Sequence, residues 1–270
     1  MKSDHPTWAL ETHVFPEKEE QSLLSLLESI GVEFCTPKAH ELSRFDRWDQ
    51  IDIPRGSCFF VRQFSQQRSW LGDVWGNPED FDCSRYYPKF GHPLINKDGR
   101  IMSINELLWK LNSIRDELDS QGDLFIRPDD GFKSFEGEVV SSEGIDQWLN
   151  RLSLLQIPRH TKILVASPRR LTSEWRIQMV DGKAVAASRY RPVWEQGAPT
   201  EVLEYAENFA SNAAWNVRAY AMDIATTESG LGLVEVGCIL CMAFYESDPR
   251  AIVHALQELV AECRNGNTNC

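Results

Sequence analysis

Residues 221–238 read AMDIATTESGLGLVEVGC, and this pattern predicts a pair of antiparallel strands. The segment 218–225 alternates apolar and polar residues like a half-buried strand, and 231–238 is its expected partner across a polar loop. Asp223 lies near the end of the first strand and Glu235 near the end of the second. If the two strands pair, both carboxylates can point into one pocket.

Both carboxylates stand among apolar residues, where a lone buried charge would be costly without a cation. Two acidic oxygens are what a protein commonly offers to Mg²⁺, with nucleotide phosphates and water completing its coordination. The alternative is that Asp223 or Glu235 is an exposed charge at a strand end. We favour the first interpretation, so the sequence predicts a magnesium site at these two residues.

An upstream hairpin brings basic residues toward the same sheet. The segment 174–191 reads EWRIQMVDGKAVAASRYR, and its central Asp-Gly dipeptide is a strong turn signal. Glu174 and Arg176 alternate along one strand and therefore face the same side, and Arg189 or Arg191 returns near them. Arginine side chains there could hold a carboxylate or a phosphate by forked hydrogen bonds. The alternative is a sheet face with ordinary salt bridges.

A third segment, 124–137, reads LFIRPDDGFKSFEG. A strand delivers Arg127, and a loop with two glycines and Lys133 follows it. Small residues let backbone N–H groups approach phosphate oxygens, while the lysine and the arginine supply positive charge. The spacing is not that of a Walker loop. A surface hairpin with an incidental lysine explains this segment, taken alone, equally well.

The rest of the chain predicts an α+β protein. Apolar residues at helical spacing predict helices at 17–30, after the Ser103–Glu106 capping box up to Leu118, at 145–152, at 202–210 behind an N-cap at Thr200, and at 251–263 behind Asp248 and Pro249. Further strands are expected at 123–127 and 161–167. Residues 44–98 are rich in Trp, Pro, Gly and Asp, and we expect irregular structure there. We therefore expect a mixed α/β lobe at 1–120, followed by antiparallel sheets flanked by helices at 121–270.

Composition excludes several classes of protein. The net charge of −12 repels phosphates, so binding to nucleic acid or to an anionic membrane is not expected, although an aromatic and arginine-rich stretch at 62–87 favours nucleic acid. No apolar run reaches the roughly 18 residues that a membrane span needs. The seven cysteines are an odd number in a chain of 270 residues, so we expect reduced thiols and a cytoplasmic protein.

Cys238 and Cys241 form a C-x-x-C motif. Alone, such a motif is compatible with half of a zinc site or with a redox pair. No second C-x-x-C or matching histidine pair accompanies it, so the motif predicts small buried thiols. No serine or cysteine hydrolase motif is present.

The order of these segments resembles the ATP-grasp superfamily. The closer likeness is to the R2K clade, which is found mainly in phages and bacteria and is named for two arginines and a lysine. The similar segments are 8-WALETHVF-15, 79-EDFDCSRYYPKFGHPLIN-96, 124-LFIRPDDGFKSFEG-137 and 244-FYESDPRAIVHAL-256. The resemblance implies an ATP-grasp-like fold, in which ATP is clamped between two lobes of antiparallel sheet and helix.

The resemblance also implies a role for each site residue. The residues that would contact the nucleotide are Arg127 at the α-phosphate, Lys133 at the β- and γ-phosphates, Val165, Ala166 and Ser167 at the adenine, and Glu174. Those that would act on the reacting groups are Arg176 and Arg189 at the γ-phosphate or acyl phosphate, with Lys133. Asp223 and Glu235 would hold Mg²⁺.

The implied activity is that of an ATP-dependent carboxylate–amine ligase working through an acyl phosphate. ATP and Mg²⁺ are the implied nucleotide and cofactor, and the acid and amine are an unknown amino acid, peptide or protein. One position departs from the family pattern, because Gly237 stands where an asparagine usually completes the metal site. The alternative is therefore a degenerate, non-catalytic ATP-binding module that acts through a partner.

Overall fold

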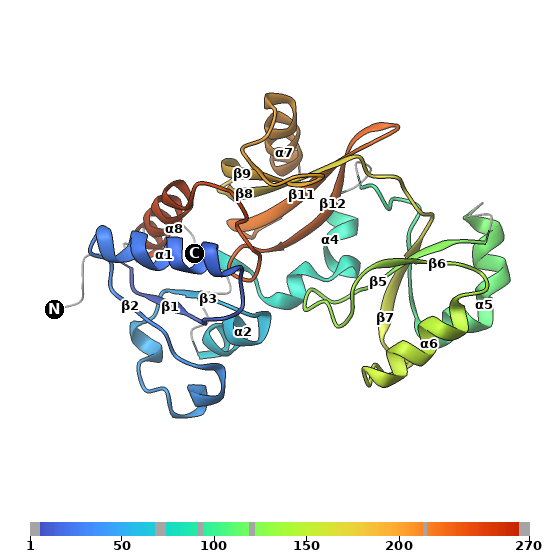
Figure 1. The fold of residues 1–270 in the computed structure, drawn as a ribbon, viewed down its shortest axis with the longest axis horizontal. Helices are drawn as coiled ribbons and strands as arrows, with labels where there is room; N and C mark the ends of the chain where they lie inside the picture. Colours follow the sequence, from blue (N-terminus) through green and yellow to red (C-terminus); the bar gives the residue numbers. More distant parts are fainter. Residues whose placement is uncertain (1–5, 68–73, 91–93, 119–121, 213–214, 265–270) are drawn as a thin grey trace.

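The computed structural model describes residues 6–67, 74–90, 94–118, 122–212 and 215–264, and its strands form three sheets (Figure 1). The first sheet is parallel, with the order β2-β1-β3. Its strands are β1 (Trp8–Leu10), β2 (Phe34–Cys35) and β3 (Ile53–Arg55). Helix α1 (Glu17–Ser29) connects β1 to β2, and helix α2 (Cys58–Gln67) follows β3.

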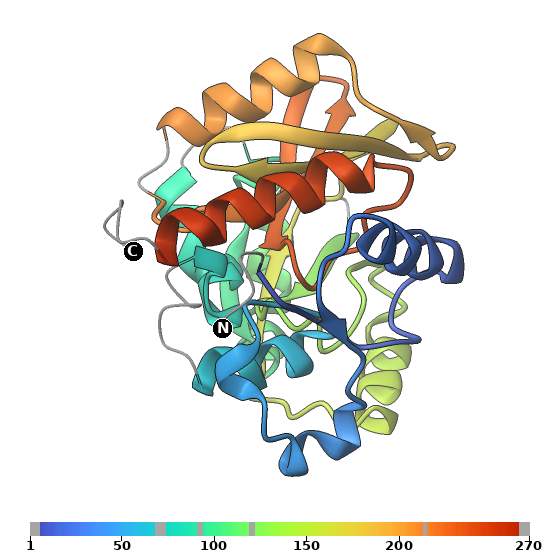
Figure 2. The same cartoon turned by 90° about the vertical axis from the view of Figure 1, so that its left-hand side faces the viewer.

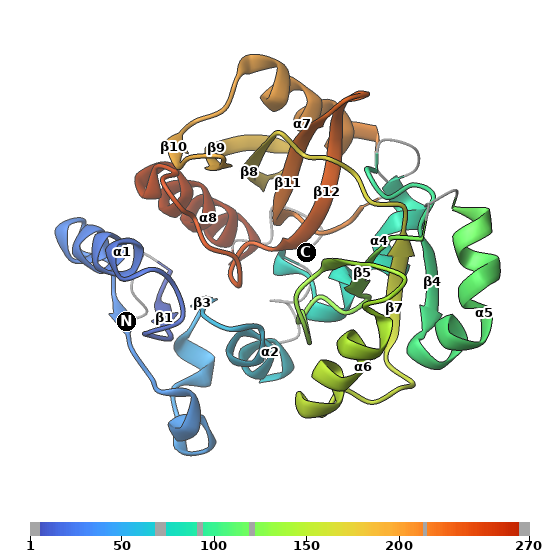
Figure 3. The ribbon, with the colours of Figure 1, turned by 45° about the vertical axis from the view of Figure 1, so that its right-hand side comes forward.

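The second sheet has the order β4-β7-β5-β6 and is antiparallel. Its strands are β4 (Arg100–Ser103), β5 (Leu124–Pro128), β6 (Glu138–Val140) and β7 (Lys162–Ala166), and it is flanked by α5 (Ile104–Glu117) and α6 (Ile145–Leu154). The division that the sequence suggested at residue 120 stays a prediction, although the β4–β7 ladder runs across it. Figure 3 shows this sheet and its two helices as one body beside the third sheet.

The third sheet is also antiparallel, with the order β10-β9-β8-β11-β12. Its strands are β8 (Ser173–Val180), β9 (Lys183–Arg191), β10 (Glu195–Gln196), β11 (Ala219–Thr227) and β12 (Gly230–Cys238). Two helices, α7 (Thr200–Asn212) and α8 (Pro249–Arg264), pack on it (Figure 2). Both predicted hairpins are therefore confirmed, and Gly182 has the positive φ of 75° that its turn requires.

The expectation of irregular structure at 44–98 is wrong in two places. Besides β3, this stretch contains α2 and a further helix, α4 (Cys83–Phe90), together with short 3₁₀ turns. Helix α2 buries one face, which carries Phe60, Val61 and Phe64. The helix is short, so the helical spacing of these residues could not be distinguished from the aromatic residues around them. Residues 68–73 of the aromatic and arginine-rich stretch lie outside the described residues.

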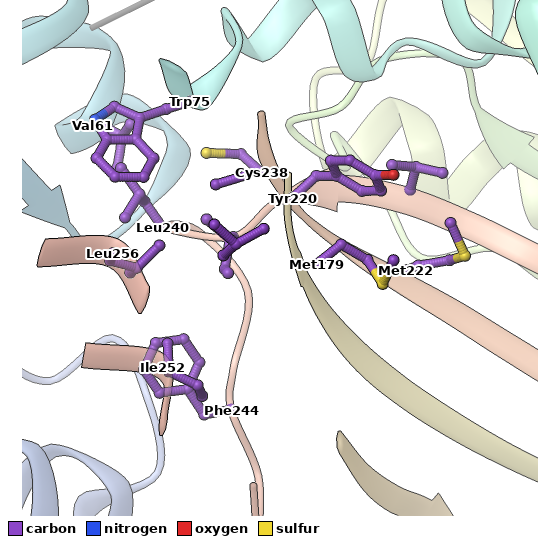
Figure 4. Packing of buried hydrophobic residues seen from close by; sticks show 14 of the residues in the cluster. Val61, Trp75, Met179, Tyr220, Met222, Cys238, Leu240, Phe244, Ile252 and Leu256 are labelled. Carbon is purple, nitrogen blue, oxygen red and sulfur yellow. The ribbon is translucent and has the colours of Figure 1, made fainter. Parts of the chain in front are cut away.

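Two hydrophobic cores result from this arrangement. The larger one joins the first and third sheets, and Figure 4 shows Trp75 and Val61 on one side and Met179 and Tyr220 on the other, with Leu240 between them. The smaller core lies under the second sheet and is built around Trp148 and neighbouring aliphatic residues. The second sheet therefore has a core of its own, next to the body that contains both ends of the described chain.

Arg55 ties the first sheet to the segment that follows β12. It is only 2% exposed, and its guanidinium donates to the carbonyl oxygens of Ile239 at 3.2 Å and Met242 at 3.1 Å. It also forms an ion pair with Glu19 and lies 3.5 Å from the centre of the Phe244 ring. A buried charge is stable only when it is paired in this way, so these contacts hold the segment after β12 against the first sheet.

Local expectations hold at most positions. The capping box at Ser103 and Glu106 is present, whereas Thr200 is the first residue of α7 rather than its cap.

Reduced thiols are confirmed at Cys35, Cys58, Cys83, Cys238 and Cys241. That prediction is wrong at Cys263, which is disulfide-bonded, and Cys270 lies outside the described residues. No helix within the described part of the chain is long and apolar enough to cross a membrane.

Candidate active site

Glu235 on β12 is the centre of a cluster of buried charges. Its carboxylate lies 2.7 Å from Lys133 Nζ, 3.0 Å from Arg127 Nη2 and 3.8 Å from Arg176 Nη2. Arg127 lies near the end of β5 in the second sheet, and Lys133 follows in the loop after that strand. The cluster therefore joins the second sheet to the third, at the position where the two bodies meet (Figure 3).

Asp223 on β11 lies directly opposite Glu235 on one side and Arg176 on the other. Arg176 donates two hydrogen bonds to it, from Nε at 2.8 Å and from Nη2 at 2.7 Å. The expectation of a position near the strand end is wrong for Asp223, which lies in the middle of β11, whereas β12 ends at Cys238 as predicted, three residues beyond Glu235. The two carboxylates are neighbours in register, since opposed side chains in a ladder lie next to each other, and their shared metal site stays a prediction.

The cations change the acidity of both carboxyl groups. Burial raises the pKa of Glu235, but the charges of Lys133, Arg127 and Arg176 outweigh it and hold the pKa well below its usual value. Burial dominates at Asp223, where the pKa is raised in spite of Arg176. Burial lowers the pKa of Lys133, but the charge of Glu235 outweighs burial, so the pKa is raised. Three cations thus balance two carboxylates, and one positive charge remains for an anionic ligand.

Two strand irregularities adjoin the cluster. Glu174 pairs with Arg191 and Trp175 with Arg189, so Tyr190 is the extra residue of a β-bulge in β9. A second bulge leaves Val234 unpaired next to the acidic residue of β12. Bulges re-aim side chains and are common beside active sites.

The bulge directs Tyr190 into the site. Its hydroxyl lies 2.8 Å from Glu174 Oε2 and 3.2 Å from Asp223 Oδ2, and so fixes both carboxylates. Arg191 lies 2.7 Å from Glu174 Oε1, so Arg191, rather than Arg189, is the arginine that returns near Glu174. Alternation along the strand does not reveal this, because the bulge shifts the register by one residue.

Tyr245 closes the cluster on the side of α8. Its ring is stacked on Tyr190 with centroids 5.0 Å apart, and Arg176 lies 4.8 Å from its centroid. Its backbone has a φ of 54°, which is unfavourable for a tyrosine. Lys133 shares this feature with a φ of 54°. Strained residues of this kind gather at functional sites.

A cleft that is open to solvent lies over the cluster and has a volume of about 320 Å³. Arg127, Lys133, Arg176, Glu235 and Tyr245 all line it. Its size is within the range of small-ligand sites, and its polar groups converge from two sheets. The cleft can therefore hold a multiply charged anion together with a cation.

Other residues predicted for the site lie elsewhere. Arg189 forms an ion pair with Glu195, and its neighbour in register on β8 is Trp175. Val165 and Ala166 are buried in β7, and Ser167 follows them. The hydroxyl of Ser167 donates to Leu118 O at 2.9 Å. The roles assigned to these residues stay predictions.

Met242 explains why position 237 is a glycine. A Cβ atom added to Gly237 would come within 2.3 Å of Met242 Sδ. A larger side chain, such as a third oxygen ligand, therefore fits only if the methionine moves. No group of three or more acidic, histidine or cysteine residues in the described ranges forms a metal site. The two opposed carboxylates still suit Mg²⁺, which commonly takes one or two from a protein.

Comparison with curated proteins finds one distant likeness. The alanine–tRNA ligase of Methanobrevibacter smithii is 25% identical over an alignment of 220 residues that covers 74% of this chain. The match spans only 23% of that ligase, so the chain corresponds to a small part of it.

Three solved structures share the fold. The D-cycloserine synthetase DcsG has a TM-score of 0.66 at 13% identity, over 95% of this chain and 99% of that one. The D-alanine–D-alanine ligase of Bacillus anthracis complexed with ATP has a TM-score of 0.62 at 13% identity, over 98% and 100%. The ATP-grasp ligase PsnB with a precursor variant, Mg and ADP has a TM-score of 0.57 at 13% identity, over 96% of this chain and 99% of that one.

The sequence pattern of one family covers most of the chain. The family described as "ATP-grasp domain, R2K clade family 3" matches residues 57–256. The matched range contains both sheets that form the cleft and every charged residue of the cluster around Glu235. The fold of the two solved ligases and of the synthetase agrees with it. The chain therefore belongs to the R2K clade of the ATP-grasp superfamily.

Proposed function

We propose that this protein joins a carboxylate to an amine at the expense of ATP, through an acyl phosphate. The observation that supports this most directly is the convergence of Arg127, Lys133 and Arg176 on Glu235 in one cleft, with Asp223 bound to Arg176 beside it. Membership of a family of ATP-dependent ligases gives the reaction class.

The chemistry explains why such a site needs cations more than a nucleophile. A carboxylate oxygen attacks the γ-phosphorus of ATP, an O–P bond forms, and the bond to ADP breaks. The amine nitrogen then attacks the acyl carbon, phosphate leaves, and the amine loses a proton. Negative charge is concentrated on the transferring phosphoryl group, so fixed cations stabilise the transition state.

Each charged residue then has a defined task. Lys133 and Arg127 would leave Glu235 to contact phosphate oxygens, and Arg176 would neutralise the transferring group. Asp223 and Glu235 would hold Mg²⁺, which supplies positive charge to the phosphates when it is bound. Tyr190 orients Asp223 through its hydroxyl hydrogen bond. No side chain of the cluster needs to form a covalent intermediate.

The substrates belong in a second cleft of about 200 Å³, which shares Tyr245 with the first. Trp194, Phe244 and the Lys18–Glu246 ion pair line it, so it offers aromatic surface and both signs of charge. Amino acids or peptides, which carry amines and carboxylates, suit such a lining. The names of two structural neighbours, a D-alanine–D-alanine ligase and a ligase with a precursor peptide, support this class.

The decisive experiment is a structure with a non-hydrolysable ATP analogue and Mg²⁺. Phosphates between Lys133 and the Asp223–Glu235 pair are expected, and phosphates elsewhere would overturn the site. A parallel assay measures ADP and phosphate released with a panel of amino acids and dipeptides. Release should require both an acid and an amine.

One observation favours a second candidate, an ATP-binding module without turnover. Met242 fills the space beside Gly237, and a weak metal site follows if a third protein ligand is essential. Tight binding of ATP with no ADP formed across the whole panel would support this candidate. Release of ADP that depends on both substrates would exclude it.

A further inference from the structure

The Cys238–Cys241 motif has no task in the proposed ligation, and the structure adds a third thiol to it. Cys58, the first residue of α2, lies beside this motif, because Gly56 N donates to Leu240 O at 3.1 Å and so brings the start of α2 next to the turn with Cys241. We call these three residues the thiol cluster. All three line the same cleft as Lys133 and Glu235.

The thiol cluster is held from two separate parts of the fold. The turn that carries Cys241 rests on the buried Arg55 guanidinium, and Cys241 N donates to Cys238 O at 2.9 Å. The start of α2 is fixed by Glu11, which accepts hydrogen bonds from Ser57 N at 2.7 Å and Ser57 Oγ at 2.6 Å. The fold therefore holds the segments that carry Cys58 and Cys241 next to each other.

The environments of the sulfurs differ. The hydrogen bond from Cys241 outweighs burial and, with the nearby Lys133 charge, lowers the pKa of the Cys58 thiol. Hydrogen bonding to Cys238 and Cys58, together with burial, raises the pKa of Cys241. The thiolate is the form that attacks peroxides, so Cys58 is the sulfur prepared to react first. Burial raises the pKa of Cys83, which makes Cys83 an internal reference.

We propose that Cys58 and Cys241 are an oxidative modification site that takes a hydroperoxide and closes to a reversible disulfide in the wall of the cleft. The Cys58 thiolate attacks the O–O bond, an S–O bond forms, and the leaving oxygen departs with a proton as water or an alcohol. The Cys241 sulfur then attacks the sulfenic acid, the S–S bond forms, and water leaves with the Cys241 proton. Two thiols are oxidised by two electrons and one peroxide is reduced.

Closure acts on the loop that carries Lys133. The Cys58 sulfur lies 3.8 Å from the carbonyl oxygen of Gly131, to which its thiol donates, and a disulfide removes this donor. Asp82 Oδ1 accepts from Gly131 N at 2.9 Å, so the loop keeps only one of its two anchors there. We expect the oxidised protein to bind nucleotide more weakly, a consequence that rests on the proposed function.

Peptide mapping tests the disulfide directly. Reduced protein is treated with hydrogen peroxide, free thiols are alkylated, and the digest is analysed by mass spectrometry. A linked Cys58–Cys241 peptide that dithiothreitol removes supports the proposal, with Cys35 and Cys83 found alkylated. A Cys238–Cys241 link, or alkylation of Cys58 throughout, overturns it.

Serine variants test the order of the steps. C241S should accumulate a sulfenic acid at Cys58 that dimedone traps, and C58S should show neither adduct nor disulfide. C35S is the matched control and should behave like the unmodified protein, with thermal unfolding used to confirm that all variants fold. Dimedone labelling of Cys241 in C58S would contradict the assigned order.

Binding of an ATP analogue to the reduced and oxidised forms tests the consequence. A loss of affinity of about 10-fold or more, reversed by dithiothreitol, is expected for a coupling of ordinary size. Equal affinity of the two forms overturns the effect on the cleft. Absence of binding to the reduced form counts against the proposed function, and the mapped disulfide then still decides whether the modification site exists.

Discussion

Arg176 and Asp223 face each other across β8 and β11, and the guanidinium forks onto the carboxylate with hydrogen bonds of 2.8 Å and 2.7 Å. Glu235, the other carboxylate assigned to Mg²⁺, is likewise paired, with Lys133 and Arg127. Both acids are almost fully buried, and their charges are neutralised by the chain itself. When Mg²⁺ and a triphosphate bind, these ion pairs must therefore separate. The carboxylates then contact Mg²⁺, and the cations contact the phosphates.

The first prediction is that metal and nucleotide bind together. Mn²⁺ alone has to displace cations from Asp223 and Glu235, whereas a triphosphate gives those cations new partners. We expect at least about 10-fold tighter Mn²⁺ binding with an ATP analogue than without it. Titration of the protein with Mn²⁺, followed by electron paramagnetic resonance, measures this affinity. The same titration of D223N shows how much Mn²⁺ is held by the analogue in solution rather than by the site. Equally tight binding of Mn²⁺ to the free protein would refute the exchange.

The second prediction concerns Lys133. Truncation in K133A removes a cation from the cleft, so we expect at least about a 10-fold loss in kcat/KM for ATP, since charged hydrogen bonds are worth about 1.5–3 kcal/mol. Lys183 is exposed and pairs with Glu207 outside the cleft, which makes K183A a matched control. Coupled measurement of ADP release compares the two. Full activity of K133A would remove Lys133 from the site.

The third prediction concerns Asp223. D223N keeps the size of the side chain but removes a charge that Mg²⁺ prefers, so the Mg²⁺ concentration for half-maximal activity should rise about 10-fold or more. The ATP dependence at saturating Mg²⁺ should change less. Activity is measured against Mg²⁺ at fixed ATP. An unchanged magnesium profile would show that Asp223 is not a ligand.

The fourth prediction uses the contact between Gly237 and Met242. G237N forces its Cβ against the Met242 sulfur, and overpacking of this kind costs about 1–3 kcal/mol. The double variant G237N/M242A has room for the new side chain and should recover part of this loss. Urea unfolding of the two variants and the parent measures the difference. Equal stability of G237N and the parent would mean that Met242 moves freely.

The fifth prediction is a pH dependence at Glu20. This carboxylate accepts hydrogen bonds from the backbone N–H groups of residues 13–15, at 2.9, 2.8 and 2.9 Å, and so holds the segment that lines the cleft with Val14 and Phe15. Burial raises its pKa, but these bonds outweigh burial and lower it below 4.5. A carboxylate with a lowered folded-state pKa stabilises the protein above its unfolded pKa, and this contribution is lost as the pH falls through the folded value.

E20Q tests that contribution. At pH 7 the variant should be less stable by about 1 kcal/mol, a value reduced for the partial exposure of the side chain. At pH 3 the difference between variant and parent should shrink. Urea unfolding at both pH values measures it, with E17Q, in the same turn of α1, as the control. A gap that stays constant with pH would show that the charge of Glu20 contributes nothing.

The sequence predicted the hairpins and the acidic pair because alternation and an Asp-Gly turn are local signals. It could not predict that Arg127 of one sheet reaches Glu235 of another, since this contact depends on how two sheets meet. Tyr190 was missed because a bulge, which alternation does not reveal, turns it toward Asp223. Met242 carried no signal, because its role depends only on the space beside Gly237.

The Arg55 contacts have a consequence for synthesis on the ribosome. Two of the oxygens that accept from this guanidinium belong to Ile239 and Met242, which are translated almost two hundred residues later than Arg55. Until they emerge, Glu19 is the partner of Arg55, and burying the guanidinium would leave Nη1 without its acceptors, so the first sheet should stay loose during elongation. The earliest part of the chain is thus expected to consolidate among the last, and a nascent protein would need protection over most of its translation.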